Sequence, residues 1–317
     1  MKKALSVIIC THNPKWNNLE KALTALKAQT LSLNQWELLL IDNASKNILS
    51  SAIDLTWHPN ARHIRENKLG LTAARLCGFK EAIAQTIVFV DDDNILDSEY
   101  LENTVKIFQE NPNLGAIGGK SLPEFEVEPE PWFAELNPPL GIRDLGDKTQ
   151  VCLWNTELTK IDSSAKYYPD FAPIGAGLVI RKQAAEIYVK RITGDSLRLA
   201  LGRTGKKLTS GEDNDIVLTL LENGWGVGYF PQLKLTHIIP ASRLTKDYLA
   251  RLNRASSHSW IQVLDVHGIR LWQKIPRWTV LLRKIKAFFY YQPWKNPASY
   301  IRWQGACGMF EGQADIL

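Results

Sequence analysis

The segment Ile87-Val88-Phe89-Val90-Asp91-Asp92-Asp93-Asn94 decides how this sequence is interpreted. Its apolar run is typical of a short buried strand, and three carboxylates follow at once. Adjacent carboxylates repel each other, so a folded protein rarely keeps them at a strand end without a cation or a hydrogen-bonding ligand. Oxygen ligands suit Mg²⁺ or Mn²⁺, and Mg²⁺ is commonly held by carboxylates together with substrate phosphates. The segment therefore predicts a metal-assisted site for a diphosphate.

Strands and helices alternate on both sides of this segment. Strands are expected at residues 5–10, 36–41, 62–65, 114–118, 178–180 and 226–230, and helices at 17–29, 72–85, 98–109, 183–189 and 212–222. The alternation predicts an α/β fold with a mostly parallel, Rossmann-like sheet and helices on both faces. Thr72 and Ser98 are expected to cap their helices.

Three polar clusters follow strand ends in this scheme: residues 11–13, Asp42 and the aspartate triplet. Ligands bind outside the carboxyl ends of such strands, so the three clusters should converge on one edge of the sheet.

Composition favours a protein with a substantial hydrophobic core and with its cysteines in the reduced, thiol form. The chain has 317 residues, of which 45% are hydrophobic, enough for a substantial core. Residues 1–13 do not resemble a signal peptide, and no apolar run approaches the roughly 20 residues of a membrane-spanning helix. The four cysteines are far apart and show neither zinc spacing nor a dense disulfide pattern. We therefore expect a cytosolic protein.

Five motifs occur in an order that resembles family 2 glycosyltransferases of the GT-A fold. They are Ser6–Asn13 (SVIICTHN), Ile41–Ser45 (IDNAS), Glu66–Arg75 (ENKLGLTAAR), the aspartate triplet, and Gly211-Glu212-Asp213. Each motif alone is a weak signal, but five in order are specific. The resemblance implies transfer of a sugar from a nucleotide-sugar donor.

The resemblance covers about residues 1–240 and implies a domain division. Residues 1–240 would form the GT-A catalytic domain, with a nucleotide-binding half at 1–119 and an acceptor-binding half at 120–240. Seven prolines between residues 120 and 175 exclude long helices there and predict a loop-rich flap over the site. Residues 241–317 would be a basic, aromatic helical extension.

The resemblance implies a nucleotide pocket formed by Thr11, Asn13 and Asp42. A carboxylate at a strand end can accept a hydrogen bond from the imide N–H of uracil. The alternative is that Asp42 caps a turn with its neighbours. Arg75 would contact the nucleotide or the diphosphate, with a solvated helix face or an ion pair with a nearby aspartate as alternatives.

Similarity to the family's Asp-x-Asp pattern places Asp91 towards the ribose and Asp93 on the metal ion, with Asp92 as a substitute for Asp91. His237 follows the strand expected at 226–230 and Pro231, and in many relatives a histidine near this position completes the metal site, so the resemblance makes His237 a second metal ligand. Imidazole suits Mn²⁺ better than Mg²⁺. The alternatives are solvated acids and a structural histidine. The implied cofactor is Mn²⁺ or Mg²⁺, which would neutralise charge on the departing diphosphate.

In the family's Glu-Asp motif the aspartate usually acts as the base, so the resemblance makes Asp213 the group that takes the acceptor proton, and Glu212 the group that orients the acceptor. The alternative is that Glu212, Asp213 and Asp215 complement the positive end of a helix dipole. Gly175-Ala176-Gly177 resembles the small-residue segment beside the acceptor sugar, although a tight turn explains it as well.

The basic C-terminal end is compatible with two interpretations, a membrane-binding helix and a helix packed on the catalytic domain. Residues 240–317 carry twelve Lys or Arg and four Asp or Glu, net +8, which leaves −3 for residues 1–239. Helices are expected at 243–264 and 276–291, and the second has one broad apolar face with basic residues around it. This pattern fits a helix at an anionic membrane surface, and it fits equally a helix packed on the catalytic domain.

The sequence thus favours an inverting, metal-dependent glycosyltransferase. The donor would be a nucleotide sugar, with a UDP-sugar expected, and the acceptor a saccharide or a lipid-linked molecule. The enzyme would be cytoplasmic, with peripheral contact at the inner face of the cell membrane as a further expectation. A sugar-phosphate nucleotidyltransferase would carry a glycine-rich loop after the first strand, but residues 11–15 contain no glycine. A nucleic-acid-binding module is disfavoured by the acidic N-terminal part and by the lack of a recognition motif.

Overall fold

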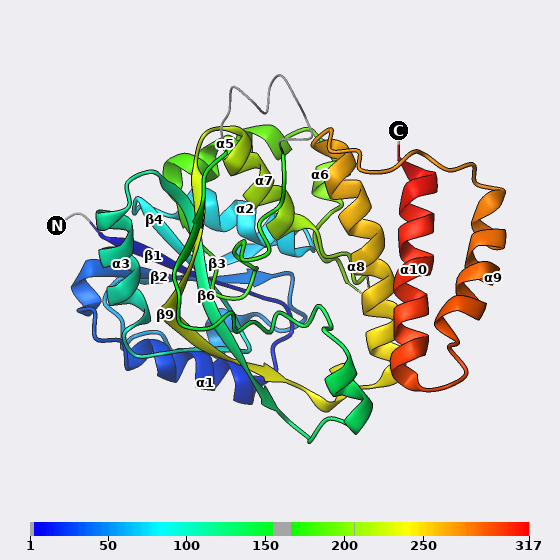
Figure 1. The fold of residues 1–317 in the computed structure, drawn as a ribbon. Coiled ribbons are helices and arrows are strands. Elements are labelled where there is room, and N and C mark those ends of the chain that lie inside the picture. Colours follow the sequence, from blue (N-terminus) through cyan, green and yellow to red (C-terminus); the bar gives the residue numbers. More distant parts are fainter. Residues whose placement is uncertain (1–2, 155–165, 206, 317) are drawn as a thin grey trace. The chain divides into compact units, whose positions relative to one another are not determined.

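The computed structural model describes residues 3–154, 166–205 and 207–316 (Figure 1). The chain divides into two compact units. The sheet unit comprises residues 1–124, 141–195 and 216–238, and the helical unit comprises residues 125–140, 196–215 and 239–317. The predicted division at residue 240 stays a prediction, and each unit is described by itself.

The sheet unit holds one mixed sheet in the order β3-β2-β1-β4-β8-β6-β9-β5, with β7 paired to β9. Its strands are β1 (Leu5–Thr11), β2 (Trp36–Asn43), β3 (Ala61–Glu66), β4 (Thr86–Asp91), β5 (Asn94–Leu96), β6 (Leu114–Phe125), β7 (Gln150–Cys152), β8 (Val179–Arg181) and β9 (Gly226–Ile239). Strands β3, β2, β1 and β4 are parallel, whereas β8 pairs antiparallel with both β4 and β6. The α/β fold class is confirmed, but the sheet is mixed rather than mostly parallel. The parallel pairs are confined to β3, β2, β1 and β4, and the pairs β4–β8, β6–β8, β5–β9 and β7–β9 are antiparallel.

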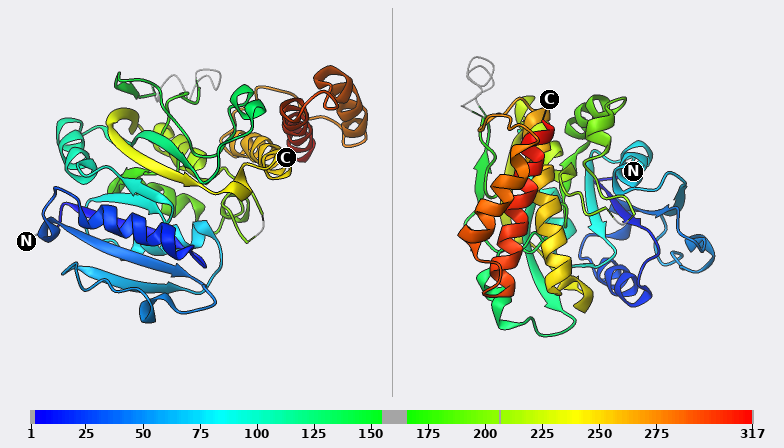
Figure 2. Two further views of the ribbon diagram at one scale, coloured as in Figure 1. Left: turned by 90° about the horizontal axis from the view of Figure 1, so that it is seen from below. Right: turned by 90° about the vertical axis from the view of Figure 1, so that its right-hand side faces the viewer.

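Helices cover both faces of the parallel strands (Figure 2). The helices along this part of the chain are α1 (Trp16–Lys27), α2 (Leu71–Glu81), α3 (Tyr100–Glu110), α5 (Lys182–Ile192) and α7 (Glu212–Glu222), with single turns η1 (Leu33–Gln35) and η2 (Leu49–Ser51). Val7 and Ile9 of β1 share a core cluster with apolar residues of α1 and α3. Ile8 points to the other face, where a Cβ on Gly78 of α2 would lie 2.9 Å from its Cγ2 atom. The alternation along β1 therefore buries both faces.

Two predicted helix caps are wrong. Helix α2 begins at Leu71 after Gly70, whose φ is +140°, and Thr72 lies inside the first turn. Helix α3 begins at Tyr100, two residues after Ser98. Helix α2 also ends at Glu81 rather than near residue 85. The backbone amides that follow donate hydrogen bonds to buried side chains of β2 and β1 instead of continuing the helix. Ile83 N lies 2.7 Å from Glu37 Oε1, and Ala84 N lies 3.0 Å from Ser6 Oγ.

Strands β6 and β9 are longer than predicted, with 12 and 14 residues. Each contains a proline, Pro123 or Pro231, and a proline is usually taken as the end of a strand. Two consequences correct the sequence interpretation. The expected flap begins with regular strand structure, and His237 lies within β9 rather than after a strand. Residues 155–165 of the flap lie outside the described residues.

The helical unit contains α6 (Ser196–Leu199), α8 (Lys246–Val266), α9 (Thr279–Tyr291) and α10 (Pro297–Asp315), with short turns η3 (Pro131–Glu135) and η5 (Ala241–Arg243). Helices α8 and α9 confirm two predictions, whereas α10 was not predicted. Helix α10 packs closely on α8 through Gly305, Gly308 and Gly312, which share one face (Figure 1). A Cβ on Gly308 would lie 2.0 Å from the Arg254 carbonyl oxygen, so only glycine allows this approach.

Of the helices that the structure describes, none is both long and apolar enough to cross a bilayer.

Candidate active site

The polar clusters that follow β1, β2 and β4 meet at one edge of the sheet, as predicted. In the parallel register Thr11 is aligned with Asp42, and Cys10 is aligned with Asp91. The Thr11 hydroxyl donates a hydrogen bond to Asp92 Oδ2, which joins the first and third clusters directly. The carboxyl ends of the parallel strands therefore form a single polar edge.

The loop after β1 is tied to the loop after β2 by Asn13. Its backbone N–H donates to Ser45 Oγ (2.9 Å), and its Oδ1 accepts from Lys46 N (2.9 Å). Asn13 and Ala44 both have positive φ values, +48° and +54°. Non-glycine residues in this region store strain and occur preferentially at functional sites. The residues predicted to form the nucleotide pocket, Thr11 and Asn13, thus lie where the loops after β1 and β2 are hydrogen-bonded to each other.

Asn43 fixes a third loop and was missed by sequence reasoning. Its Oδ1 accepts from Gly70 N (2.8 Å), and its Nδ2 donates to the carbonyl oxygen of Lys68 (2.8 Å). Asn43 is buried, and it connects the end of β2 to the start of α2. Its place directly after Asp42 in the Ile41–Ser45 motif is the signal that could have identified it.

Asp42 is a buried carboxylate with several donors. It accepts hydrogen bonds from Ser45 N (3.0 Å), Leu49 N (3.2 Å) and Arg65 Nη1 (2.6 Å). Burial alone would raise the pKa of Asp42, but the hydrogen bonds from Ser45, Arg65 and Leu49 together lower it below its usual value. The turn with Ser45, the alternative considered for this residue, is present, while Arg65 was not foreseen.

Arg75 is buried, with 3% of its surface exposed, so the alternative of a solvated helix face is wrong. Its guanidinium lies 5.2 Å from the centre of the Phe89 ring, and Nη2 lies 3.5 Å from the carbonyl oxygen of Gly175. Arg75 therefore connects α2 to the segment predicted to contact the acceptor.

The segment Gly175-Ala176-Gly177 makes a tight turn before β8. Gly177 has φ +69°, and a Cβ there would lie 2.5 Å from Leu235 Cδ2. The Tyr100 hydroxyl donates to the carbonyl oxygen of Gly177 (2.6 Å). Packing therefore accounts for Gly177, and acceptor contact stays a prediction for this segment.

Asp93, in the turn directly before β5, lies beside His237 of β9. Asn94, the next residue after Asp93, is aligned with His237 in the antiparallel β5–β9 pair, and Asp93 Oδ1 lies 3.4 Å from His237 Nε2. Both side chains are at least nine-tenths buried. His237 Nδ1 is buried and has no hydrogen-bond partner in the described part of the chain. The ring also packs against Gly141, where a Cβ would lie 3.3 Å from His237 Cε1.

This pair fits a divalent cation that takes its remaining ligands from a substrate. A carboxylate oxygen and an imidazole nitrogen 3.4 Å apart can bind one ion, and the nitrogen ligand favours a transition-metal ion such as Mn²⁺ over Mg²⁺. Within residues 3–154, 166–205 and 207–316 no group of three or more such side chains is placed to hold a metal. Metal sites in enzymes that bind nucleotides commonly use one or two protein ligands plus substrate phosphates.

The Glu212-Asp213 pair begins α7, within the helical unit. Glu212 is buried and Asp213 is half-buried, and Asp213 Oδ1 accepts from Asn214 N (3.0 Å). Asp215 is completely buried in a cluster with Arg198 and His267, so its role is structural. The first turn is acidic, as the helix-dipole alternative requires. The base assignment to Asp213 stays a prediction.

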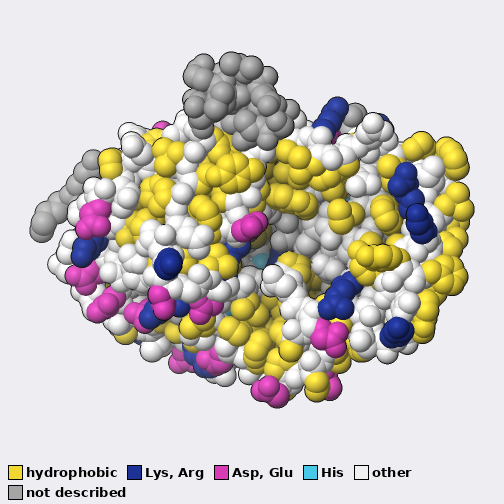
Figure 3. Space-filling view, viewed as in Figure 1, with side chains coloured by type: hydrophobic (Ala, Val, Ile, Leu, Met, Phe, Trp, Pro, Cys, Tyr) yellow, Lys and Arg dark blue, Asp and Glu magenta, His cyan; other side chains and the backbone are white. Residues whose placement is uncertain are grey.

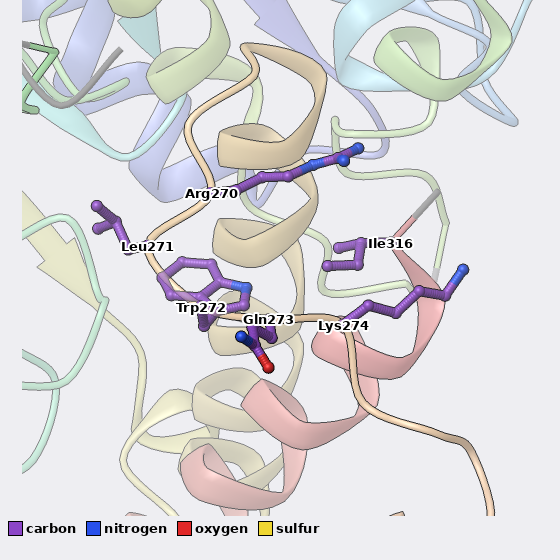
Figure 4. Close-up of a pocket in the computed structure, with 6 residues that line it drawn as sticks. All are labelled: Arg270, Leu271, Trp272, Gln273, Lys274 and Ile316. Atoms are coloured by element: carbon purple, nitrogen blue, oxygen red, sulfur yellow. The ribbon is translucent and has the colours of Figure 1, made fainter. Parts of the chain in front are cut away.

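An open hollow of about 470 Å³ lies elsewhere in the helical unit (Figure 4). It is lined by Arg270, Leu271, Trp272, Gln273, Lys274 and Ile316. None of the predicted site residues contributes to it, so it has no part in the predicted chemistry.

Comparison with known families decides the classification. The family model "Glycosyl transferase family 2" matches residues 6–186, more than half of the chain. The chain belongs to glycosyl transferase family 2. The resemblance noted from the five motifs is therefore confirmed, and the match contains every predicted nucleotide-site residue. His237, Glu212 and Asp213 lie beyond it.

Two curated relatives match parts of this family 2 protein. A glucosyl-dolichyl phosphate glucuronosyltransferase from Haloferax volcanii is 20% identical over 134 residues, 41% of this chain and 42% of the relative. An uncharacterized glycosyltransferase from Rickettsia felis is 28% identical over 109 residues, 34% of this chain and 17% of the relative. The chain thus matches less than half the length of both relatives.

Solved structures of S. aureus TarS share the fold of this family 2 chain. TarS 1-349 in complex with UDP-GlcNAc aligns with a TM-score of 0.53 and 14% identity, covering 96% of this chain and 90% of TarS 1-349. TarS 1-349 alone gives a TM-score of 0.50 over 99% of this chain and 90% of that one. At this identity the likeness supports the α/β fold with its helical C-terminal part.

Proposed function

We propose that this protein is an inverting, metal-dependent glycosyltransferase that moves a sugar from a UDP-sugar to a saccharide or lipid-linked acceptor. The observation that carries the proposal is the pairing of Asp93 with His237 at 3.4 Å in the sheet unit, which also holds the loops around Asp42. Membership of family 2 supports sugar transfer. The UDP and UDP-GlcNAc complexes of TarS support a uridine donor.

In this proposal the loops after β1 and β2 bind the nucleotide. Thr11 and Asn13 shape the pocket, and Asp42 accepts a hydrogen bond from the imide N–H of uracil. Arg75 neutralises charge beside the nucleotide from its buried position on α2. Asp91 binds the ribose hydroxyls, with Asp92 as the alternative, although Asp92 also accepts a bond from Thr11.

Asp93 and His237 would hold Mn²⁺ or Mg²⁺ together with oxygens of the donor diphosphate. When bound, the cation stabilises the negative charge that develops on the departing diphosphate. The chain's own contribution is to keep the Asp93 carboxylate and the His237 imidazole buried and close together, because the β5–β9 pairing begins at Asn94, directly after Asp93. This arrangement limits competition from water for the two ligand atoms.

Asp213 would act as the general base. It takes the proton of the acceptor hydroxyl while that oxygen bonds to the anomeric carbon and the bond from this carbon to the diphosphate breaks. Direct displacement by a single base inverts the configuration at this carbon. Glu212 would orient the acceptor, and Gly175-Ala176-Gly177 would lie beside the acceptor sugar.

The same proposal includes the domain division and the location. Residues 1–240 form the catalytic domain, with halves at 1–119 and 120–240, and residues 241–317 form the extension. The enzyme works in polysaccharide or glycoconjugate assembly, peripherally at the inner face of the cell membrane. The name of the Haloferax volcanii relative, which includes a glucosyl-dolichyl phosphate, supports a lipid-linked acceptor.

A donor screen tests the proposal. UDP-, GDP- and dTDP-sugars are supplied with and without Mn²⁺, and release of the nucleoside diphosphate is measured. We expect turnover of a UDP-sugar only with the metal, no turnover for Asp93→Ala, and UDP binding without transfer for Asp213→Asn. Asp97→Ala, an exposed carboxylate after β5, is the control and should keep its activity. Full activity of either site variant, or activity in a chelator, would refute the assignment.

A further inference from the structure

Helix α9 carries a row of large apolar side chains that are exposed. Trp278, Leu281, Leu282, Ile285 and Phe289 are 75%, 66%, 59%, 47% and 64% exposed. Trp278 is the N-cap residue of α9, and the steps of three, one, three and four residues from Trp278 to Phe289 keep these side chains on one face of the helix. Contiguous exposed apolar surface of this kind is uncommon on soluble proteins and marks a binding surface.

The opposite face of α9 packs on α10 and fixes the orientation of the helix within the helical unit. Ala287 is buried, and the rings of Phe288 and Trp303 lie 5.3 Å apart. Trp303 Nε1 donates to the carbonyl oxygen of Lys284 (3.1 Å), and the Lys284 ammonium pairs with Glu311 of α10. Lys284 and Ala287 thus face α10, so the apolar row points away from it.

The surroundings of this row are positively charged. Between residues 266 and 310 the sequence contains no acidic residue and eight basic ones: Arg270, Lys274, Arg277, Arg283, Lys284, Lys286, Lys295 and Arg302. Four of these basic residues, Arg270, Arg277, Lys284 and Arg302, pair with acidic residues outside this range. Figure 3 shows hydrophobic side chains along the right-hand edge, where Figure 1 places α9, with Lys and Arg side chains beside them. Trp278, Tyr290 and Trp294 stand at the ends of the helix and are at least half exposed.

We propose that the α9 face, defined as Trp278, Leu281, Leu282, Ile285 and Phe289, binds the surface of an anionic lipid bilayer. A helix with an apolar face, basic flanks and no acids lies in the plane of the interface, with the apolar side chains among the acyl chains. Amphipathic Trp and Tyr rings prefer the headgroup level. Membrane binding would give the enzyme access to a lipid-linked acceptor, and this role rests on the proposed function. The exposed apolar face and the basic residues around it support lipid binding independently of that function.

Charge complementarity favours lipid over a second copy of this chain as the partner. A symmetric dimer through the α9 face would bring the Arg283 and Lys286 side chains of two copies together, and α9 carries no acidic residue to neutralise them. An anionic headgroup layer supplies that neutralisation across the whole surface. Lys284 pairs with Glu311, so Arg283 and Lys286 are the basic residues of α9 that would contact the anionic headgroups.

Vesicle flotation of the full chain tests the inference. We expect flotation with vesicles that contain phosphatidylcholine and phosphatidylglycerol, and much less with phosphatidylcholine alone. The double variant Leu281→Gln, Phe289→Gln should weaken partitioning by about tenfold or more, because two apolar side chains no longer enter the acyl region. Arg283→Glu with Lys286→Glu should abolish the preference for anionic vesicles.

A matched control carries the same chemical change elsewhere. Ile48→Gln with Ile83→Gln alters two residues of the sheet unit that are 60% and 59% exposed, and it should float like the parent protein. Turnover of a UDP-sugar with a soluble acceptor should be equal for all variants, which separates failure of this inference from failure of the proposed activity. Absence of flotation, or a concentration-dependent dimer that Leu281→Gln, Phe289→Gln dissociates, would overturn the lipid assignment.

Discussion

Arg65 and Asp42 form an ion pair across β3 and β2, with Nη1 and Oδ2 2.6 Å apart. Asp42 and Arg65 are aligned in the parallel register, and the second arm of the guanidinium donates to the carbonyl oxygen of Ser45 (2.9 Å). Arg65 thus holds both the carboxylate and the loop that follows it. The pair keeps Asp42 ionised, and an ionised carboxylate only accepts hydrogen bonds.

Replacing Asp42 with Asn should change base preference. An ionised Asp42 matches the N3–H of uracil and opposes the unprotonated N3 of cytosine, whereas the Asn amide can rotate to donate to cytosine. We expect the ratio of UDP to CDP affinity, measured by titration calorimetry, to fall by about tenfold. The exposed Asp54→Asn should leave the ratio unchanged. If Asp42 only ties the loop, UDP and CDP binding would weaken together and the ratio would stay constant.

His58 should make the sheet unit less stable in mild acid. Its ring lies 4.1 Å from the Trp36 ring, and its Nδ1 accepts from Asn60 N (3.1 Å). Burial, with a smaller effect of Lys3, lowers the pKa of His58 from 6.5 to about 4. The unfolded chain therefore binds the proton first, so stability is full above pH 6.5 and declines as the pH falls towards 4.

At pH 5 this linkage corresponds to about 2 kcal/mol of lost unfolding free energy. His58→Asn keeps an acceptor for the Asn60 amide but cannot titrate. The variant should be less stable at pH 7, because it loses the Trp36 contact, and its urea midpoint should depend less on pH between 7 and 5. Parallel pH profiles of the two proteins would show that another group is responsible.

The sequence was most informative where chemistry is local. The apolar runs predicted the ends of β1, β2 and β4, and parallel pairing then had to bring Thr11, Asp42 and the aspartates together. Asp93 and His237 are different, because 144 residues separate them and only the β5–β9 pairing aligns them. The resemblance, rather than any spacing, pointed to that pair.

What sequence reasoning missed depends on long-range packing. Helix α10 contains three glycines, which lower helix propensity, and it is stable because all three let α8 approach. Arg65 was expected only as the last residue of a short strand, and the β2–β3 pairing is what places it beside Asp42. The apolar row of α9 was equally compatible with core and surface, and the exposure of Leu281 and Phe289 favours the surface.

Ala44→Gly should stabilise the protein. Ala44 has φ +54°, a conformation that disfavours an L-residue by about 1–2 kcal/mol. Glycine removes that strain but loses about 0.5–1 kcal/mol through the greater freedom of the unfolded chain. The expected net gain in unfolding free energy is about 0.5–1 kcal/mol. Ala25→Gly, inside α1, should lose about 1 kcal/mol in the same urea titration. A loss at both positions would mean that the Ala44 methyl group makes a contact worth more than the strain.

The buried cluster of Arg198, Asp215 and His267 should be the most sensitive point of the helical unit. Arg198 donates to Asp215 and to the carbonyl oxygen of Val266 (3.0 Å), and His267 Nε2 lies 2.7 Å from Asp215 Oδ1. The side chains of Arg198 and Asp215 are 4% and 0% exposed. Arg198→Met leaves a buried carboxylate without its cation, which should reduce the unfolding free energy by about 3–5 kcal/mol.

The double variant Arg198→Met, Asp215→Leu should recover part of that loss, because no charge is then buried alone. Arg277→Met provides the control, since its pair with Asp315 is exposed and should contribute about 0–1 kcal/mol. With the single variant Asp215→Leu added, urea unfolding of the parent, the two single variants and the double variant gives the coupling energy of the pair. Equal losses for Arg198→Met and Arg277→Met would show that the buried pair does not stabilise the start of α7, and with it the position of Asp213.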